Sequence, residues 1–224
     1  MSDNATAHKA NEYESEIQRT IPFHGEILRT AIDVVLAVRE DPARWLDSGC
    51  GPGKLVELAC ARSPKTEFWL ADPSEAMLAL ARARHPEISA GRFIAKRTQE
   101  LPELEAFDAI TAIQCHHYGD ADARLAALVR CRELLAPGGV LVTFENVRAE
   151  TDVGHAIQRK RWADFQRRKG RDEASIEKQL AREGTAFFPI RVSEHLVLLA
   201  RAGFADVEIV WRAYGQAGFS ARRR

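Results

Sequence analysis

The stretch RWLDSGCGPGKLVELA, residues Arg44–Ala59, decides how this sequence is interpreted. An apolar run ends at Asp47, three glycines follow at alternate positions, and a helical pattern begins at Lys54. Glycine accepts backbone conformations with positive φ and leaves room for a ligand to approach the backbone. The first turn of a helix presents N–H groups that favour a carboxylate or a phosphate. The stretch therefore predicts a strand, a ligand-binding loop and a helix, in that order.

Composition predicts one soluble domain without a strong electrostatic preference. The chain has 224 residues, 46% of them hydrophobic, and a formal net charge of zero. A strongly basic chain would have indicated nucleic acid or an anionic membrane. The basic residues concentrate late in the chain: from residue 148 onward there are 16 Lys+Arg against 10 Asp+Glu, a surplus of six.

Cysteine spacing and hydropathy predict a cytoplasmic protein. The four cysteines form no C-x-x-C pair, which argues against a zinc site or a redox dithiol. The amino-terminal segment lacks the apolar core of a signal peptide, and no apolar run approaches the ~20 residues of a membrane span. We expect reduced thiols and no membrane association.

Strands and helices alternate along most of the chain. Strand patterns at 44–47, 66–72, 91–95, 106–115 and 137–147 are separated by helical patterns. Strict alternation predicts a parallel sheet with helices on both faces. The order fails at 150–184, where two charged helices predict a helical cap inserted into a single domain of residues 12–224. Residues 1–11 are polar and are expected to be disordered.

The glycine spacing separates two classes of cofactor. A dinucleotide fingerprint reads G-x-G-x-x-G, but Lys54 stands at its third glycine position. The observed spacing is G-x-G-x-G, with Asp47 two residues before the first glycine. The segment DSGCGPG resembles the [DE]-x-G-x-G-x-G signature of class I S-adenosylmethionine (SAM) dependent methyltransferases. This resemblance implies a Rossmann-like, doubly wound, seven-stranded and mostly parallel sheet.

The same resemblance assigns cofactor contacts to the first two strands. Asp72 ends the second strand, 19 residues beyond Gly53, where a carboxylate can accept both ribose hydroxyls. LADPSEAML is similar to the family's acidic motif, which places Pro73 at the site and Met77 beside the adenine. The resemblance implies that Asp47 binds the amino group of the methionine part. It implies further that the loop itself contributes Gly49, Cys50, Gly51 and Gly53.

Further segments are similar to one subgroup of the family. LPELEAFDAI and ELLAPGGVLV resemble the segments that enter strands four and five. EIQRTIPFHGEI and AGFADVEIVWRAYGQAGFSA, residues 202–221, resemble the ends of a subgroup that methylates small molecules. The similarity covers about residues 12–224 except the cap. It implies that Tyr13 and Arg19 lie across the SAM site, with Arg19 near the SAM carboxylate; a solvated helix face is the alternative for both.

One position departs from the family pattern. Relatives often carry an acid after strand three that binds the adenine amino group, and Arg97 occupies that position here. Arginine has no hydrogen-bond acceptor, so it cannot make this contact. We expect the backbone of Thr98 or the side chain of Gln99 to replace it.

The segment QCHHYGD, which follows strand four, supplies the candidate catalytic residues. Gln114 is expected to contact the methionine part, while His116, His117 and Tyr118 lie near the acceptor. Histidine can act as a base near neutral pH, although methyl transfer from SAM needs mainly positioning. Adjacent histidines can also bind a metal, but no third ligand is evident, so no metal site is predicted.

The sequence of the cap is compatible with more than one class of methyl acceptor. Its segment QRKRWADFQRRKGR is basic with interleaved aromatic residues, so RNA is one alternative. The chain lacks the [ND]-P-P-[YFW] motif of many base-methylating relatives, which makes nucleic acid the weaker choice. We expect Trp162 to pack at the substrate site and Arg19, Arg148 or Arg191 to pair with the carboxylate or phosphate of an acidic substrate.

The sequence therefore predicts an enzyme that transfers the methyl group of SAM to a small molecule, leaving S-adenosylhomocysteine. The alternatives are a tRNA or RNA modification methyltransferase, a carboxy-SAM synthase, which shares the character of QRTIPFHGEI, and a SAM-binding module without catalysis. The leading helices could also pair in a homodimer.

Overall fold

The computed structural model describes residues 12–224, so the disorder predicted for residues 1–11 lies outside the described residues. None of the helices in the described range is long and apolar enough to cross a membrane.

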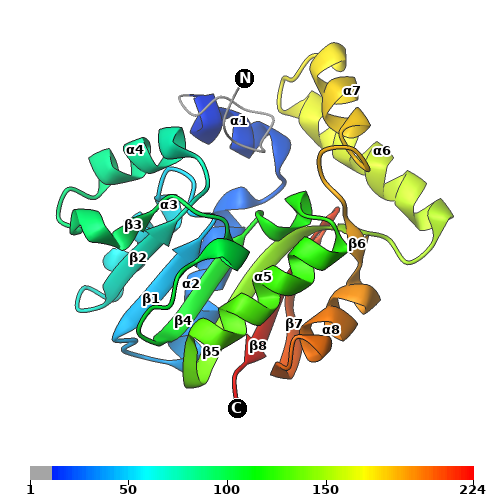
Figure 1. Ribbon diagram of the computed structural model, residues 1–224. Coiled ribbons are helices and arrows are strands. Elements are labelled where there is room, and N and C mark those ends of the chain that lie inside the picture. The colour runs from blue at the N-terminus through cyan, green and yellow to red at the C-terminus, as the bar shows by residue number, and fades with distance from the viewer. Residues whose placement is uncertain (1–11) are drawn as a thin grey trace.

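The centre of the fold is a mostly parallel sheet (Figure 1). Its strand order is β3-β2-β1-β4-β5-β8-β7, in which β1 to β5 run parallel and β8 lies antiparallel between β5 and β7. The strands are β1 (Arg44–Ser48), β2 (Glu67–Ala71), β3 (Phe93–Ile94), β4 (Phe107–Ile113), β5 (Leu135–Arg148), β7 (Ala205–Ala213) and β8 (Gln216–Arg222). The seven-stranded Rossmann-like prediction is confirmed. The two-residue strand β6 (Ile190–Arg191), which pairs with the end of β5, was not expected.

Helices cover both faces because alternate residues of each strand point to opposite sides. The helices α2 (His24–Val38), α3 (Lys54–Cys60) and α4 (Glu75–Arg84) contribute to one apolar cluster, and α5 (Ala121–Leu134) and α8 (Val192–Arg201) contribute to another. Strand β5 shows the alternation: Val140, Val142 and Phe144 join the first cluster, whereas Leu141 and Val147 join the second.

Several helices begin at a side chain that accepts a backbone N–H. Ser74 caps α4, Asp120 caps α5, Thr151 caps α6 (Asp152–Arg168) and Asp172 caps α7 (Glu173–Ala181). Such caps satisfy donors that the first helical turn leaves unpaired. Ser74 thereby places α4 directly after the end of β2, where the ligand site is formed.

Three helices gather beyond the carboxyl ends of the parallel strands (Figure 1, top). They are α1 (Tyr13–Thr20), which begins the described chain, and the cap helices α6 and α7. The indole Nε1 of Trp162 donates to the carbonyl of Thr20 at 2.6 Å, and the guanidinium of Arg19 donates to the carbonyls of Lys169 and Gly170. The cap and α1 are therefore joined in both directions. A side chain of the cap donates to a carbonyl at the end of α1, and a side chain of α1 donates to carbonyls of the cap.

Candidate functional site

The glycine loop leaves the end of β1 in a conformation that suits glycine. Gly49, Gly51 and Gly53 have φ of 71°, 52° and 79°. A Cβ on Gly49 would lie 2.4 Å from the Cβ of Cys115, which no real structure tolerates. Gly49 N and Cys50 N both donate to the carbonyl of Ala71 at the end of β2, at 2.7 and 3.0 Å. The loop is therefore held against the neighbouring strand before any ligand binds.

Asp72 connects the glycine loop to the start of α4. Its Oδ2 accepts the N–H of Gly51 at 2.9 Å, and its Oδ1 accepts the N–H of Ser74 at 2.9 Å. Each carboxylate oxygen can accept more than one hydrogen bond. The group that the sequence assigned to a ribose therefore also orders the backbone on both sides of the site.

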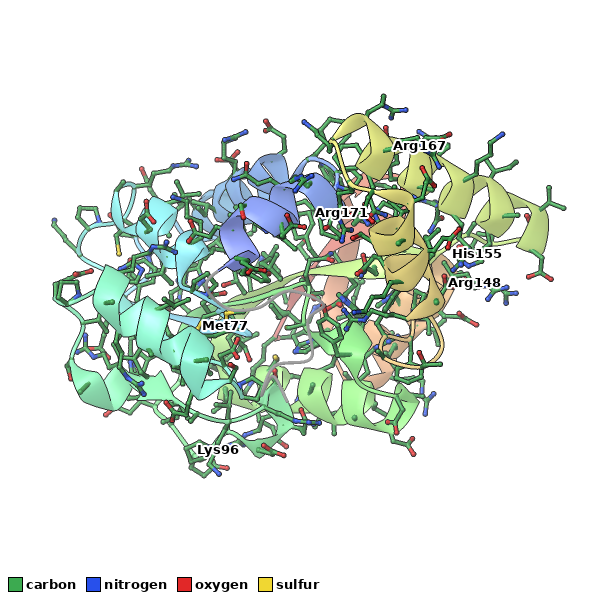
Figure 2. All side chains as sticks on the ribbon, turned by 90° about the horizontal axis from the view of Figure 1, so that it is seen from above. Met77, Lys96, Arg148, His155, Arg167 and Arg171 are labelled. Carbon is green, nitrogen blue, oxygen red and sulfur yellow. The ribbon has the colours of Figure 1, made fainter. Side chains whose placement is uncertain are left out.

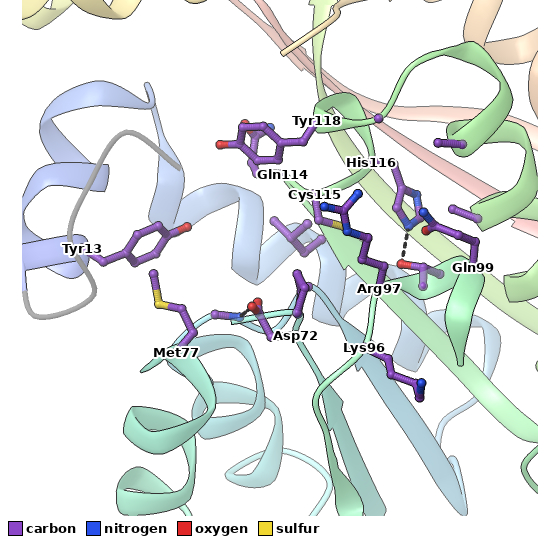
Figure 3. A pocket seen from close by; sticks show the side chains of 18 residues that line it. Tyr13, Asp72, Met77, Lys96, Arg97, Gln99, Gln114, Cys115, His116 and Tyr118 are labelled. Carbon is purple, nitrogen blue, oxygen red and sulfur yellow. Dashed lines mark hydrogen bonds between the residues drawn. The ribbon is translucent and has the colours of Figure 1, made fainter. Parts of the chain in front are cut away.

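A pocket opens at this point, and it brings together residues from distant segments (Figure 3). The predicted residues that line it are Tyr13, Gly49, Gly51, Asp72, Pro73, Met77, Thr98, Gln99, Gln114, His116 and Tyr118. Other residues in its wall, which the sequence did not single out as contacts, include Lys96, Ile113, Cys115, Gly119, Ala123 and Ala127.

Other predicted residues do not line this pocket. Cys50 is buried in the core cluster beside the loop, and Gly53 begins α3. Trp162, a residue of α6, is buried against the end of α1. His117 has no exposed surface.

The three arginines proposed for an acid also lie outside the pocket wall. Arg19 holds the loop between α6 and α7 and pairs with Glu16 at 2.8 Å. Arg148 pairs with Asp152 at 2.7 Å, and Figure 2 shows it beside the cap, away from Met77. Arg191 precedes α8 and interacts with Glu194 at 3.7 Å. Arg19 and Arg148 therefore bind groups of the cap, and Arg191 binds a residue of α8. The direction of these side chains depends on tertiary contacts, which sequence position alone does not reveal.

Asp47 lies under the loop and is 2% exposed. Its Oδ1 accepts the hydroxyl of Thr111 at 2.8 Å, and the same hydroxyl oxygen accepts the indole N–H of Trp45 at 3.0 Å. Burial raises the pKa of Asp47 to about 7; the bond from Thr111 opposes this rise and the charge of Asp72 adds to it. A cationic group arriving here would favour the ionised form.

Gln114 presents an unpaired donor to the pocket. Its backbone has φ of 56°, and its N–H donates to the carbonyl of Phe144 at 2.6 Å, which fixes the end of β4. Its side-chain Nε2 is buried and has no hydrogen-bond partner among residues 12–224. A buried amide without a partner costs free energy, so a ligand that accepts from Gln114 would relieve this cost.

The segment after β3 differs from the adenine contact of the family. Lys96 and Arg97 both line the pocket with exposed side chains. The hydroxyl of Thr98 is occupied by the protein: it lies 2.7 Å from Ser48 Oγ and 3.0 Å from His116 Nε2. Gln99 also lines the pocket and can both donate and accept.

The two histidines after β4 have different surroundings, and the difference comes from Glu145 on β5. His117 Nδ1 donates to Glu145 Oε2 at 2.7 Å, and its Nε2 lies 3.1 Å from Asn146 Nδ2. His116 lines the pocket, and burial lowers its pKa. Burial opposes ionisation of Glu145, yet the bond and charge of His117, with His116 and His195, lower the pKa of Glu145 to about 2. The hydrogen bonds of His117 to Glu145 and Asn146 therefore leave its ring unavailable to a ligand. Burial favours the neutral form of His116.

The titratable phenols and thiol of the pocket are also poor bases. Burial raises the pKa of Tyr13 far above its ordinary value and that of Tyr118 to about 12. Burial likewise raises the pKa of Cys115 well above that of an ordinary thiol, and its Sγ donates to the carbonyl of Ser48 at 3.4 Å. At neutral pH these groups act as hydrogen-bond donors.

The fold does bring potential metal ligands beside His116. Cys115 Sγ, a ring nitrogen of His116 and a carboxylate oxygen of Glu145 lie within 4.8 Å of one another. The thiol is protonated and bonded to Ser48, while Glu145 accepts from His117 and Thr143. The thiol and the carboxylate are therefore bonded within the protein, whereas Nδ1 of His116 is buried without a hydrogen-bond partner among residues 12–224.

Comparison with known proteins agrees with this geometry. Residues 46–139 match the family model described as a methyltransferase domain. This segment of the chain is therefore similar to a methyltransferase domain. The match begins within β1 and ends at the start of β5, so it contains the glycine loop, Asp72 and the segment after β4.

Two kinds of curated relative resemble this chain. The carboxy-S-adenosyl-L-methionine synthase of Wolinella succinogenes is 27% identical over 222 residues, which cover 96% of this chain and 90% of the relative. The trans-aconitate 2-methyltransferase of Methylobacterium nodulans is 34% identical over 124 residues, covering 54% of this chain and 45% of the relative.

Solved structures share the fold of this chain. SAM-bound CalS10, an amino pentose methyltransferase from Micromonospora echinaspora, has a TM-score of 0.65 with 23% identity and covers both chains completely. The 1,6-didemethyltoxoflavin-N1-methyltransferase of Burkholderia thailandensis has a TM-score of 0.60 with 19% identity, covering 98% of this chain and 92% of that one.

Proposed function

We propose that the pocket binds SAM and that the enzyme transfers its methyl group to a small-molecule acceptor. The observation that carries this proposal is the bond between Gly51 N and Asp72 Oδ2, which joins the glycine loop and the predicted ribose acid at the wall of one pocket. The carboxy-SAM synthases and SAM-bound CalS10 support the choice of cofactor.

The residues of the pocket fit this cofactor. Asp72 has acceptor capacity for ribose hydroxyls, and Gln114 offers a buried amide donor. Asp47 lies under the loop, where it would become ionised beside an ammonium group. Met77 is 1% exposed and gives the pocket an apolar wall for a ring. Lys96 and Arg97 replace the usual acid, so the adenine edge would rely on Gln99 and on backbone groups.

When bound, SAM supplies an activated methyl group, and the protein has mainly to position the acceptor. Correct positioning can contribute about 7–11 kcal/mol to lowering the barrier. His116 Nε2 is occupied by Thr98, and the phenol of Tyr118 stays protonated. We therefore propose an acceptor that is already nucleophilic near neutral pH, such as a carboxylate or a neutral amine, with Tyr118 donating a hydrogen bond to it.

Carboxy-SAM synthesis is a second candidate, because the relatives of that name align over 96% of this chain whereas the trans-aconitate methyltransferase aligns over 54%. A synthase of this kind would add a carboxyl group to the cofactor and methylate nothing. The two candidates share the cofactor pocket and differ in the mass of the product.

An RNA substrate receives less support from the cap. Several of its cations already have carboxylate partners: Arg167 pairs with Asp164 and Glu173, and Arg159 pairs with Glu183. Paired cations offer less to a phosphate backbone than free ones, since each must leave its partner.

The test is mass spectrometry of small molecules released from the purified protein, combined with calorimetric titration of S-adenosylhomocysteine. Release of SAM or its demethylated product, with measurable heat on titration, would support methyl transfer. A released cofactor heavier by one carboxyl group would instead establish the synthase. Absence of any adenosyl ligand and of binding heat would refute both.

A further inference from the structure

His85, a residue that the sequence did not single out, lies under the last glycine of the loop. It follows α4 directly and is 3% exposed. Its Nε2 is 2.9 Å from the carbonyl oxygen of Gly53. A Cβ built on Gly53 would lie 3.0 Å from the His85 ring. The imidazole therefore contacts the loop through a hydrogen bond and leaves no room for a side chain at position 53.

The carbonyl of Gly53 interacts with both α3 and His85. It also accepts the N–H of Glu57 at 3.1 Å, which is the first intrahelical bond of α3. Gly53 itself has φ of 79°, and its N–H donates to the carbonyl of Cys50 at 3.0 Å. A donor that holds this oxygen fixes where the glycine loop ends and where α3 begins.

The other ring nitrogen of His85 also faces an acceptor. Nδ1 lies 3.2 Å from Oε1 of Glu87. A carbonyl and a carboxylate only accept, whereas a neutral imidazole carries a single N–H donor. Both contacts can be hydrogen bonds at the same time only when the ring carries two protons.

We infer that His85 is a positioning residue of the cofactor loop, and that it acts as an imidazolium clamped between Glu87 and the carbonyl of Gly53. The charged ring donates more strongly to the carbonyl than a neutral ring does. Cofactor affinity is consequently highest when His85 is protonated and decreases as the pH rises and the ring becomes neutral. This inference rests on the proposed cofactor.

The charges around the clamp come from three segments. Glu87 lies beyond α4, Arg84 is the last residue of α4, and Glu57 and Cys60 face the ring from α3. Burial raises the pKa of Cys60 to about 11, so its thiol is neutral. Arg84 is bound by Glu57 at 3.0 Å and by Glu14. The carboxylates of Glu87 and Glu57 therefore lie near the imidazole, and Glu57 is itself paired with Arg84 at 3.0 Å and with Lys54 at 2.8 Å.

The experiment measures S-adenosylhomocysteine affinity by calorimetry at pH 6 and pH 8.5, with EDTA present, for the natural chain and three variants. His85→Gln keeps an amide donor for Gly53 but cannot titrate. Glu87→Gln removes the carboxylate partner. Glu177→Gln is the matched control, because Glu177 is an exposed residue on α7. Other titrating groups, including Asp47, are common to all four proteins and cancel in affinity ratios.

The affinity ratio of the natural chain to His85→Gln should fall by roughly tenfold between pH 6 and pH 8.5, the size expected for a hydrogen bond from a charged group. Glu87→Gln should reduce this change, and Glu177→Gln should reproduce the natural profile. Equal ratios at both pH values would overturn the inference while leaving the cofactor assignment intact.

A second measurement needs no cofactor. Hydrogen exchange of the segment 49–57 should accelerate from pH 6 to pH 8.5, after correction for intrinsic rates, in the natural chain but not in His85→Gln. Identical corrected changes in both proteins would refute the clamp. If the natural chain bound no S-adenosylhomocysteine, the proposed function would fail, and this exchange measurement would still decide whether the clamp exists.

Discussion

Asp72 and Gly51, 21 residues apart in sequence, are joined by a 2.9 Å hydrogen bond from the Gly51 N–H to the Asp72 carboxylate. Because the same carboxylate also holds the N–H of Ser74, it organises the loop that follows β1 and the helix that follows β2. A change at Asp72 consequently affects both ligand binding and the free loop.

The first prediction concerns Asp72→Ala. The variant loses the acceptor for two backbone donors and for the proposed ribose, so S-adenosylhomocysteine affinity should fall by about tenfold or more, given roughly 1.5–3 kcal/mol for a hydrogen bond to a charged group. The melting temperature should also fall by a few degrees. Calorimetry and thermal unfolding measure the two effects, with the exposed loop residue Asp41→Ala as control. Unchanged affinity would contradict the placement of the cofactor.

The second prediction concerns pH and Asp47. Its pKa in the folded protein is about 7, above the ordinary 3.8, so the folded state holds more protons than the unfolded state between these values. Stability without ligand should therefore decrease as pH rises from about 4 to about 7. The isosteric Asp47→Asn cannot ionise and should lack this decrease, which amounts to no more than about 4 kcal/mol at about 1.4 kcal/mol for each pKa unit. Urea unfolding at pH 5 and pH 8 compares the two proteins; parallel losses in both would show that Asp47 is not responsible.

The third prediction uses two glycines as a matched pair. Gly49→Ala places a methyl group 2.4 Å from the Cβ of Cys115 at a φ of 71°, so it should destabilise the fold by about 2 kcal/mol or more. Gly91→Ala meets nothing within 4 Å and should change stability by less than about 0.5 kcal/mol. Denaturant unfolding of both variants tests the difference. Cys115→Gly should recover part of the loss in a double variant, since it removes the atoms that clash.

The fourth prediction concerns the joint between α1 and the cap. Trp162→Phe keeps most of the apolar ring but leaves the carbonyl of Thr20 without its indole donor, which should cost about 1–3 kcal/mol. Hydrogen exchange should accelerate in α1 and α6 and stay unchanged in α5. Equal protection of α1 before and after the substitution would show that the indole bond does not hold the joint.

Much of the fold could be predicted from the sequence because its signals are local. Each of these signals lies within a few residues: the change between strand and helix periodicity of hydrophobic residues, the glycine spacing, and Ser74 before α4. The structure shows the predicted strands and helices. Strand β6 escaped prediction because two residues carry no periodicity, and it forms only where Ile190 meets Val147.

Site residues could be predicted where a sequence motif lies at the end of a strand. They could not be predicted where contacts between distant segments determine the direction of a side chain. Asp72 and Gln114 line the pocket because strand ends determine their places. Arg19 does not, because α1 turns its guanidinium toward the cap. Glu145 and His85 could not be recognised, since their partners are 28 and 32 residues away and no spacing reveals them.

The fastening of α1 to the cap also sets the order in which the site can form during synthesis. Tyr13 emerges from the ribosome early, but the indole of Trp162 and the carbonyls of Lys169 and Gly170 that hold its helix follow about 150 residues later. At about 5–20 residues per second, α1 waits roughly 8 to 30 seconds for these partners. The amino-terminal wall of the pocket is therefore among the last parts of the nascent chain to reach its place, and a ligand cannot be enclosed until the cap has been made.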